Sequence, residues 1–392
     1  MAKGKKKVRI GMIGYKMMGK AHSHAYRDIP FYFDTDVVPV LQAISGRDEQ
    51  GVRRAAEKMG WASVEMDWHH LVERDDIDVI DIVSPNNTHA DIAIAAAKAG
   101  KHIICEKPLA LSVEQAQHML DAVNKAGVVH MVCHNYRFAP AVQYAKQLIQ
   151  QGKLGRIYHV RATFLQDWLM DPGYPLVWRL RKDVSGSGTL GDLGSHIIDL
   201  ARFLVGEFSE VAGMMETFIK ERPLGDMDIH LQGKVESSEK GEVTVDDAAS
   251  FLARFENGAL GVFEVSRFSR GNRAGNRFEI NGEKGSVRWD MENMNNLHVY
   301  LEEDDPGLKG FRTVNCTEVE HPYGRVYWPA GHIIGYEHTF INLLAEMMRG
   351  ISKGISPNPN FEDGVRNQMV LEAVERSVCT GKWVNISDVS YR

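Results

Sequence analysis

The first 135 residues alternate short apolar runs with segments of helical spacing. The runs are nearly continuous in Val and Ile, as expected for strands that are covered on both faces of a sheet. They are Val8–Ile13, Val38–Ile44, Val79–Val83, His102–Cys105 and Val128–Cys133. Helices are expected between them, such as Asp91–Ala99, which ends before Gly100, and a helix from Ser112 to near Asn124 with Gln115 in its capping box. This alternation predicts an α/β domain with a doubly wound parallel sheet over residues 1–135.

After Pro140 the pattern changes to short strands joined by turns. A helix is expected over Ala141–Gln150, a strand over Arg156–Phe164 and a further helix over about Asp192–Val205. Two later pairs of strand-like runs each flank an Asn-Gly dipeptide, which is a favoured two-residue hairpin turn. These pairs are Phe251–Phe255 with Leu260–Val265 around Asn257-Gly258, and Phe278–Ile280 with Ser286–Trp289 around Asn281-Gly282. The pattern predicts an α+β domain over residues 136–392 with a largely antiparallel open sheet.

Two polar and weakly patterned stretches interrupt this second domain. Residues 220–245 are expected to form a long loop, and residues 302–334 an irregular insertion. Helices over Tyr336–Arg349 and Asp363–Cys379 follow, and these last helices are candidates to pack back on the first domain.

Length, composition and charge narrow the class of protein. The 392 residues are too many for one ordinary core, and 44% hydrophobic with 25% charged residues is typical of a folded globular protein. The net charge of -6 argues against a nucleic-acid partner. A solvated tail is expected for the basic run Lys3, Lys5, Lys6, Lys7 and Arg9, with a membrane or nucleic-acid role as the alternative. No stretch reaches the ~20 apolar residues of a membrane span. The four cysteines form no C-x-x-C pair, which favours a cytoplasmic location without disulfides.

The first strand runs into a glycine-rich turn, Gly11–Gly19, that leads into a helix. In such a turn the backbone N–H groups and the helix dipole can bind a pyrophosphate. Lys16 replaces the middle glycine of the G-x-G-x-x-G pattern, and its ammonium either pairs with phosphate or points to solvent. The candidate dinucleotide-binding residues here are Gly14, Lys16, Met17, Met18 and Gly19.

The end of the second strand bears on the choice of cofactor. The carboxylate that binds the adenosine ribose of NAD is absent there, and Asp48 comes slightly late. Ser45 and Arg47 offer a small hydroxyl and a guanidinium, an arrangement that accepts a 2′-phosphate. These two residues favour NADP, and the alternative is that Arg47 is a solvated residue at the start of a helix.

Polar residues also follow two later strands, at the edge where α/β sheets bind ligands. Ser84, Pro85, Asn86 and His89 come after one strand and are candidate cofactor contacts, although they would serve equally as a turn and helix cap.

The strand that ends at Cys105 is followed by Glu106-Lys107-Pro108. The Lys107 ammonium there can stabilise a developing alkoxide, while a surface salt bridge is the alternative. Glu106 is a candidate cofactor contact, and the sequence leaves open whether the bond before Pro108 is cis.

The second domain supplies one polar stripe on a predicted helix. Asp192, His196 and Asp199 fall at i, i+4 and i+7, beside an apolar stripe that begins with Leu193. Histidine is the natural general base for removing a hydroxyl proton, so Asp192 and His196 are catalytic candidates. The alternative is a capping Asp with a histidine that is satisfied in the core.

Aromatic residues and histidines give weaker signals. Rings can stack on the C–H face of a sugar, although each could equally belong to the core. The pocket candidates are Trp168, Trp178, Arg179, Tyr323 and Tyr336. The pairs His22 with His24 and His69 with His70 lack a third ligand at a recognisable spacing, so no metal site is predicted.

These segments together resemble the family of glucose–fructose oxidoreductase, inositol 2-dehydrogenase and MocA-like proteins. The resemblance spans the whole chain, and within the family the chain is most similar to the levoglucosan dehydrogenase branch. The family signatures are Gly11–Gly19, Ser84-Pro85-Asn86, Glu106-Lys107-Pro108, Asn135-Tyr136-Arg137 and Gly191-Asp192 through His196. The likeness to the branch rests on Leu165-Gln166-Asp167-Trp168, Val205–Phe208, Gly310–Val314 and His321–Gly324.

The resemblance implies a Rossmann domain, a nicotinamide cofactor and a sugar or cyclic polyol substrate. It implies that Lys107, Asp192 and His196 form the catalytic group and that Asn135 and Arg137 border the site, with Asn135 near the cofactor. Asp167 joins the substrate candidates through its place in the branch motif. It also implies NAD as the cofactor and assembly as a homodimer or homotetramer through the open sheet of the second domain.

The resulting hypothesis is an NAD(P)-dependent oxidoreductase acting on a secondary hydroxyl of a sugar, anhydrosugar or cyclic polyol. In this hypothesis His196, oriented by Asp192, takes the hydroxyl proton while Lys107 stabilises the oxygen. Three alternatives stay open: an inositol dehydrogenase, a glycosidase that keeps its nicotinamide bound and works by oxidation and elimination, and a non-enzymatic dinucleotide-binding regulator.

Overall fold

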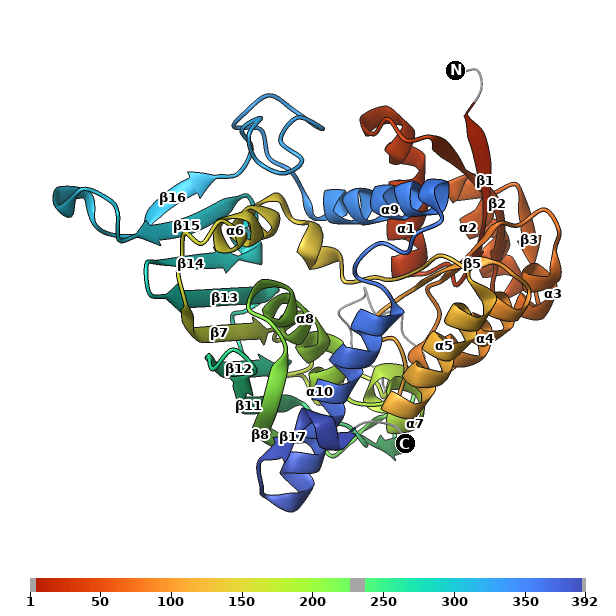
Figure 1. Ribbon diagram of the computed structural model, residues 1–392. Helices are drawn as coiled ribbons and strands as arrows, with labels where there is room; N and C mark the ends of the chain where they lie inside the picture. Colours follow the sequence, from red (N-terminus) through yellow and green to blue (C-terminus); the bar gives the residue numbers. More distant parts are fainter. Residues whose placement is uncertain (1–4, 226–236, 390–392) are drawn as a thin grey trace.

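The structure is a computed structural model that describes residues 5–225 and 237–389. Two large sheets with their covering helices make up most of the molecule (Figure 1). The first sheet has six parallel strands in the order β3-β2-β1-β4-β5-β6. They are β1 (Lys6–Ile13), β2 (Val37–Ser45), β3 (Ser63–Glu65), β4 (Val79–Ile82), β5 (His102–Cys105) and β6 (His130–Val132). The predicted doubly wound parallel sheet is confirmed.

Helices cover both faces of this sheet, which is why its strands are rich in Val and Ile. They are α1 (Met17–Tyr32), α2 (Glu49–Met59), α3 (Trp68–Glu73), α4 (His89–Lys98) and α5 (Val113–Ala126). Ile10 and Ile44 pack in one apolar cluster with α1 residues, whereas Ile80 and Ile82 pack in another with α4 and α5 residues. Strand β3 was not expected, because it is three residues long and contains one apolar residue.

The second sheet has nine strands in the order β16-β15-β14-β13-β7-β12-β11-β8-β17. All its neighbouring pairs are antiparallel except β12 with β7, so the predicted, largely antiparallel sheet is confirmed. Its strands are β7 (Ile157–Leu165), β8 (Phe208–Glu216), β11 (Ala248–Phe255), β12 (Leu260–Ser266), β13 (Gly275–Gly282), β14 (Gly285–Asp290), β15 (Asn296–Leu301), β16 (Arg312–Asn315) and β17 (Val384–Asn385).

Three helices pack on one face of the second sheet, and a fourth lies against the first domain. α6 (Pro140–Gln150), α8 (Ser195–Leu204) and α10 (Phe361–Thr380) share an apolar core with the sheet. α9 (Tyr336–Lys353) instead packs beside α1 (Figure 1). The late helices therefore connect the two sheets, while a domain boundary near residue 135 stays a prediction.

Both Asn-Gly turns differ from the sequence prediction. Between β11 and β12 the chain turns over three residues, Glu256–Gly258, which are enclosed by a hydrogen bond from the Phe255 N–H to the Ala259 carbonyl at 2.9 Å. Gly258 supplies a positive φ of 85° there. β13 continues through Gly282, where a Cβ would lie 2.2 Å from the Leu154 carbonyl oxygen, so the turn comes at residues 283–284. That glycine therefore serves a close backbone approach and not a turn.

Three other expectations need correction. The predicted loop over residues 220–245 begins and ends in a small antiparallel pair, β9 (Glu221–Pro223) with β10 (Lys240–Glu242), and residues 226–236 lie outside the described residues. Within residues 302–334, β16 forms an edge strand. The helix expected from Asp192 starts instead as a π-helical turn over Leu190–Gly194, after which α8 begins. α7 (Lys182–Ser185) is one short turn before it.

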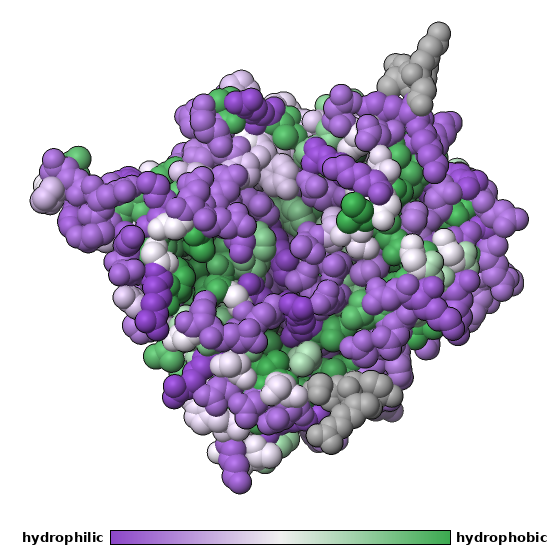
Figure 2. Space-filling model, in the orientation of Figure 1, coloured by the Kyte–Doolittle hydropathy of each residue, from purple (hydrophilic) through white to green (hydrophobic). Residues whose placement is uncertain are grey.

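Hydrophilic side chains cover most of the face seen in Figure 2, with hydrophobic side chains showing in patches between them. Among the helices that the structure describes, none combines the length and the apolar character needed to cross a membrane.

Candidate active site

The glycine-rich turn after β1 fits the pyrophosphate of a dinucleotide. Gly14 has a φ of 109°, and a Cβ there would lie 2.7 Å from the carbonyl oxygen of Val83. A Cβ at Gly19 would lie 2.8 Å from the Gly14 carbonyl oxygen. Lys16 is the exposed N-cap of α1, and within the described chain no side chain caps this helix end and no acid occupies its first turn. The first-turn N–H groups at Met17 to Gly19 are thus suited to bind phosphate.

The end of β2 leaves both cofactor readings open. Ser45 is buried and Arg47 is exposed. Asp48 caps α2 by accepting the Gly51 N–H at 3.1 Å, and it also accepts the Tyr15 hydroxyl at 3.3 Å. The predicted preference of Ser45 and Arg47 for a 2′-phosphate therefore stays a prediction.

The loops after β4 and β5 are tied together by His89. Its Nδ1 lies 3.1 Å from the Pro108 carbonyl oxygen and its Nε2 lies 3.0 Å from that of Ser84. Burial lowers the pKa of His89. Because both ring nitrogens face protein carbonyls, the geometry gives His89 a structural role in place of the predicted cofactor contact. The Asn86 amide likewise donates to the Ser185 carbonyl at 2.9 Å, reaching the second domain.

Lys107 joins the first domain to the turn that carries Asp192. The Lys107–Pro108 peptide bond is cis. Lys107 Nζ donates to Asp192 Oδ1 at 2.8 Å and to the Asp192 carbonyl at 3.0 Å. Arg267, just after β12, donates through Nη2 to Asp192 Oδ2 at 2.7 Å. Burial alone would raise the pKa of Asp192, but the charges of Lys107, Arg267 and Arg179 hold it well below its usual value.

His196 lies on the first turn of α8 in an aromatic setting. Its ring centroid is 4.7 Å from that of Tyr136, 5.8 Å from that of Phe164 and 6.1 Å from that of His134. Burial, together with the nearby Lys107 charge, lowers the pKa of His196 well below its ordinary value, so the imidazole is neutral at pH 7. Among the described residues its Nδ1 has no hydrogen-bond partner.

One detail of the mechanism predicted from the sequence needs correction. No hydrogen bond joins Asp192 to His196 in the described structure, because the Asp192 carboxylate is occupied by Lys107 and Arg267. Asp192 therefore orients the Lys107 ammonium and not the imidazole. Lys107 and Asp192 are in direct contact, and the charge of Lys107 acts on the pKa of His196.

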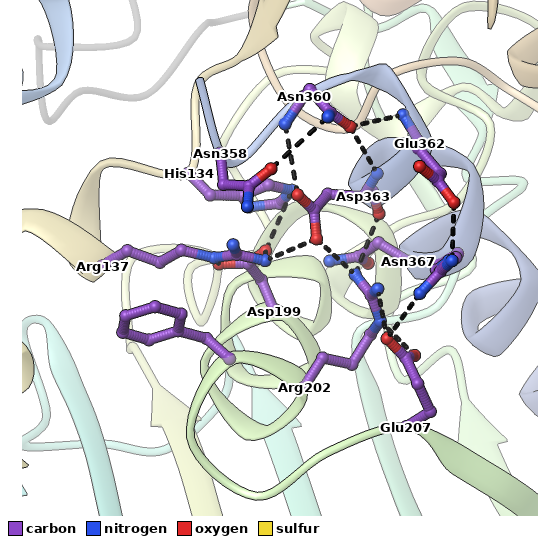
Figure 3. Close-up of polar contacts among 12 residues, drawn as sticks. His134, Arg137, Asp199, Arg202, Glu207, Asn358, Asn360, Glu362, Asp363 and Asn367 are labelled. Carbon is purple, nitrogen blue, oxygen red and sulfur yellow. Dashed lines mark hydrogen bonds and ion pairs between the residues drawn. The ribbon is translucent and has the colours of Figure 1, made fainter. Parts of the chain in front are cut away.

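Arg137, which the resemblance places at the border of the site, is buried and paired with carboxylates. Its Nε and Nη2 donate to the two carboxylate oxygens of Asp199 at 2.8 and 2.6 Å, and Nη2 also donates to Asp363 at 3.2 Å. Arg202 extends the network to Glu207, again with two hydrogen bonds (Figure 3). The guanidinium of Arg137 is thus committed to a buried network that fixes α8 against α10.

The candidates on the loop after β7 have structural partners. Asp167 accepts the Gly271 N–H at 3.0 Å and forms an ion pair of 3.1 Å with Arg273. These contacts anchor one loop to another, so the predicted substrate contact through Asp167 is not supported. The Trp168 ring lies 5.4 Å from the guanidinium of Arg267, and its Nε1 donates to Gln166.

Other candidates remain near the site. The Arg179 guanidinium lies 4.3 Å from the ring of Trp178, and its charge acts on Asp192. The Asn135 amide is buried and donates to Thr339 Oγ1 at 2.8 Å. Tyr336, on the first turn of α9, is half-buried with its ring centroid 6.1 Å from that of Tyr136. Tyr323, a further pocket candidate, packs instead beside Phe33 with centroids 6.4 Å apart.

Sequence reasoning missed two features. Arg267 follows an ordinary strand, and no motif distinguishes it from surface arginines. His22 lies within reach of Glu106 and Cys133, three potential metal ligands whose ligand atoms lie within 4.8 Å of one another. Their separation along the chain follows no metal-binding spacing, and only the parallel sheet brings them together.

Two family models match this chain. Residues 8–134 match a model described as an oxidoreductase family with an NAD-binding Rossmann fold, and residues 142–288 match the GFO/IDH/MocA C-terminal domain. Levoglucosan dehydrogenase of Pseudarthrobacter phenanthrenivorans is 42% identical over 98% of this chain and 99% of its own length. Myo-inositol 2-dehydrogenase of Thermotoga maritima is 29% identical over 97% of this chain and 99% of its own.

Solved structures agree with this result. An oxidoreductase domain protein from Kribbella flavida has a TM-score of 0.92 and 48% identity, with 97% of this chain and 99% of that chain covered. A levoglucosan dehydrogenase in complex with NADH has the same TM-score and coverage at 42% identity.

Proposed function

Because the chain belongs to the GFO/IDH/MocA family of NAD-binding oxidoreductases, we propose that it oxidises a secondary hydroxyl of an anhydrosugar of the levoglucosan type. The observation that carries the proposal is the contact of Lys107 with Asp192 beside a neutral His196. This contact supports a site in which an ammonium from the first domain acts together with a base from the second. The near full-length similarity to levoglucosan dehydrogenase supports the substrate class.

In this proposal each of the three residues has a separate task. The neutral imidazole of His196 accepts the proton of the substrate hydroxyl. The Lys107 ammonium, held by Asp192, donates to the oxygen as negative charge develops on it. Arg267 holds the other carboxylate oxygen of Asp192, so the carboxylate stays ionised and fixed. A bound nicotinamide supplies the acceptor for the hydride that leaves the carbinol carbon, so the product is a ketone.

The residues proposed to hold the cofactor and the substrate come from both domains. We propose that Gly14, Lys16, Met17, Met18 and Gly19 hold the pyrophosphate. Ser84, Pro85, Asn86, Glu106 and Asn135 would border the nicotinamide half. Trp168, Trp178, Arg179 and Tyr336 would border the sugar.

The test is an initial-rate assay of purified protein with levoglucosan, myo-inositol and glucose, each with NAD and with NADP. We expect the largest kcat/KM for levoglucosan, with reduced nicotinamide formed in step with ketone. A larger kcat/KM for myo-inositol would change the proposed substrate class from an anhydrosugar to an inositol, as in the name of the Thermotoga maritima relative. Turnover of glycosides with no added cofactor and no net reduction would indicate oxidation and elimination. Cofactor binding without turnover of any sugar would favour a regulator.

A second copy of the chain is the proposed partner. The neighbouring strands β8, β11 and β12 of the second sheet carry exposed apolar side chains, with Met214 at 70% and Leu252 and Val262 each at 50% of full exposure. Such a row favours association through the sheet as a dimer or tetramer. Sedimentation equilibrium checks this, with Leu252→Glu expected to shift the mass towards the monomer. The four unpaired cysteines support a cytoplasmic location.

A further inference from the structure

A fully buried histidine lies next to the loop that carries Lys107. His22 Nδ1 lies 2.9 Å from Asp81 Oδ2, and its Nε2 lies 3.1 Å from Glu106 Oε1. His22 and Asp81 are completely buried, and Glu106 is 6% exposed. One imidazole therefore holds two buried carboxylates, one at each ring nitrogen.

The contacts continue from Glu106 to the main chain of Lys107. The second carboxylate oxygen, Glu106 Oε2, accepts the N–H of Lys107 at 3.1 Å. At the other end, the hydroxyl of Tyr26 donates to Asp81 at 3.0 Å. A hydrogen-bonded chain thus runs from α1 through Asp81, His22 and Glu106 to the residue whose side chain binds Asp192.

The charge state of this chain follows from its surroundings. Burial alone would lower the pKa of His22, but the Asp81 carboxylate raises it well above the ordinary value. Burial opposes the ionised form of Glu106, yet His22 lowers the pKa of that carboxyl. The imidazolium can therefore donate to both carboxylates, one at each ring nitrogen.

We propose that His22 is a positioning residue for Lys107, acting through the carboxylate of Glu106. This inference rests on the proposed catalytic role of Lys107. A carboxylate held on one side by His22 presents its other oxygen to the Lys107 N–H in a fixed place. Lys107 is then held at two points. Glu106 holds its main-chain N–H, and Asp192 holds its Nζ. The loss of either anchor lets the ammonium drift from the substrate oxygen.

Two isosteric substitutions separate the two halves of the imidazole. His22→Asn places an amide at the position of Nδ1, which keeps the contact with Asp81 and abandons Glu106. His22→Gln places an amide at the position of Nε2, which keeps the contact with Glu106. Because a misplacement of about 1 Å can cost about 100-fold in rate, we expect His22→Asn to lower kcat about 10-fold to 100-fold and His22→Gln about threefold or less. The Kd for NADH is expected to stay unchanged in both.

Tyr26→Phe is the matched control. It removes a hydrogen bond from Asp81 in the same buried cluster, on the side away from Glu106. We expect it to lower the unfolding temperature while kcat stays near that of wild type. Glu106→Gln tests the same link with His22 intact, because an amide has one acceptor oxygen and cannot accept from both His22 and the Lys107 N–H, and kcat is again expected to fall. Glu106→Gln tests the inference if the His22→Asn variant does not fold.

The outcomes are distinct. Equal kcat values for His22→Asn and His22→Gln, or a loss in Tyr26→Phe as large as in His22→Asn, would overturn the positioning role. So would wild-type turnover in Glu106→Gln. A wild-type protein that is inactive on every sugar defeats the proposed function instead. Loss of activity in Lys107→Met combined with full activity in His22→Asn defeats this inference alone.

Discussion

Asp192 and Asp199 lie seven positions apart and both bind basic side chains, yet they do different work. Asp192 lies in the π-helical turn before α8, and its side chain is 26% exposed beside Lys107 and Arg267. Asp199 lies within α8, and its side chain is 1% exposed beside Arg137. An ion pair that is buried from solvent can only hold the fold together, whereas a partly exposed ion pair leaves its cation accessible to a ligand. The two aspartates thus differ in role because their side chains differ in exposure to solvent.

The π-helical turn explains why the two carboxylates diverge. A regular α-helix would place Asp192, His196 and Asp199 on one stripe. A π-helical turn has more residues per turn, so it changes the direction in which Asp192 points relative to α8. Asp192 consequently reaches the first domain while Asp199 turns to Arg137 and α10. The comparison therefore predicts that one carboxylate matters for rate and the other for stability.

The largest expected effect is on stability, from Asp199→Asn. The substitution keeps the shape but leaves Arg137 with Asp363 as its one remaining anionic partner. Breaking a buried pair by neutralising one member costs about 3–5 kcal/mol, so the free energy of unfolding in urea should fall by that amount. The kcat of the folded variant at low temperature should change little. A large loss of kcat with unchanged stability would reverse the comparison.

The next effect is on rate, from Lys107→Met. Removing one donor to a developing oxyanion costs about 100-fold to 1,000-fold in kcat, and a similar loss is expected here. Stability should change by about 1 kcal/mol or less, because Asp192 keeps Arg267 and the Lys107 pair is partly exposed. Steady-state kinetics and urea unfolding on the same preparation check both values. A variant within a few-fold of wild-type kcat would exclude Lys107 from catalysis.

The sequence predicted the parts of the site that depend on local signals. The glycine turn, the Lys107 loop and both sheets follow from motifs and periodicity within short windows. The partners of Arg137 and Asp192 could not be predicted, because Asp363 and Arg267 come from elements far along the chain. The local sequence of Arg267 does not differ from that of an arginine on the surface. The burial that assigns their roles is a property of the packed structure.

His134 and His196 lie near these carboxylates. Their protonation should affect different properties, stability for His134 and activity for His196. Burial lowers the pKa of His134 to about 4, and the pKa of His196 is lowered in the same direction. Each stays neutral in the fold but protonates in the unfolded chain below about pH 6.5. The free energy of unfolding therefore decreases as the pH is lowered through that range. For His134 the loss at pH 5 is about 2 kcal/mol.

His134→Asn tests this assignment. It should remove that part of the acid destabilisation, so the difference in unfolding free energy between pH 7 and pH 5 should shrink by about 2 kcal/mol. The pH profile of kcat/KM should keep its acid limb, because that limb follows the protonation of His196. An unchanged pH dependence of stability, with a shifted acid limb of activity, would assign His134 to the site instead.

The smallest expected effect concerns Arg47, which among the described residues has no carboxylate partner of the kind that Arg137 has. Arg47 is exposed just after β2, and Ser45 at the end of that strand offers a buried hydroxyl. If Arg47 binds a 2′-phosphate, the contact is a solvent-exposed ion pair worth about 1 kcal/mol or less, so Arg47→Gln should raise KM for NADP about fivefold at most. KM for NAD should stay unchanged, because NAD carries no charge at that position. The ratio of the two KM values, measured at low and at high salt, isolates the charge: the NADP effect should fade as salt screens it. An equal change in both constants would mean that Arg47 acts through the fold of this turn, like Arg137, and does not contact the cofactor.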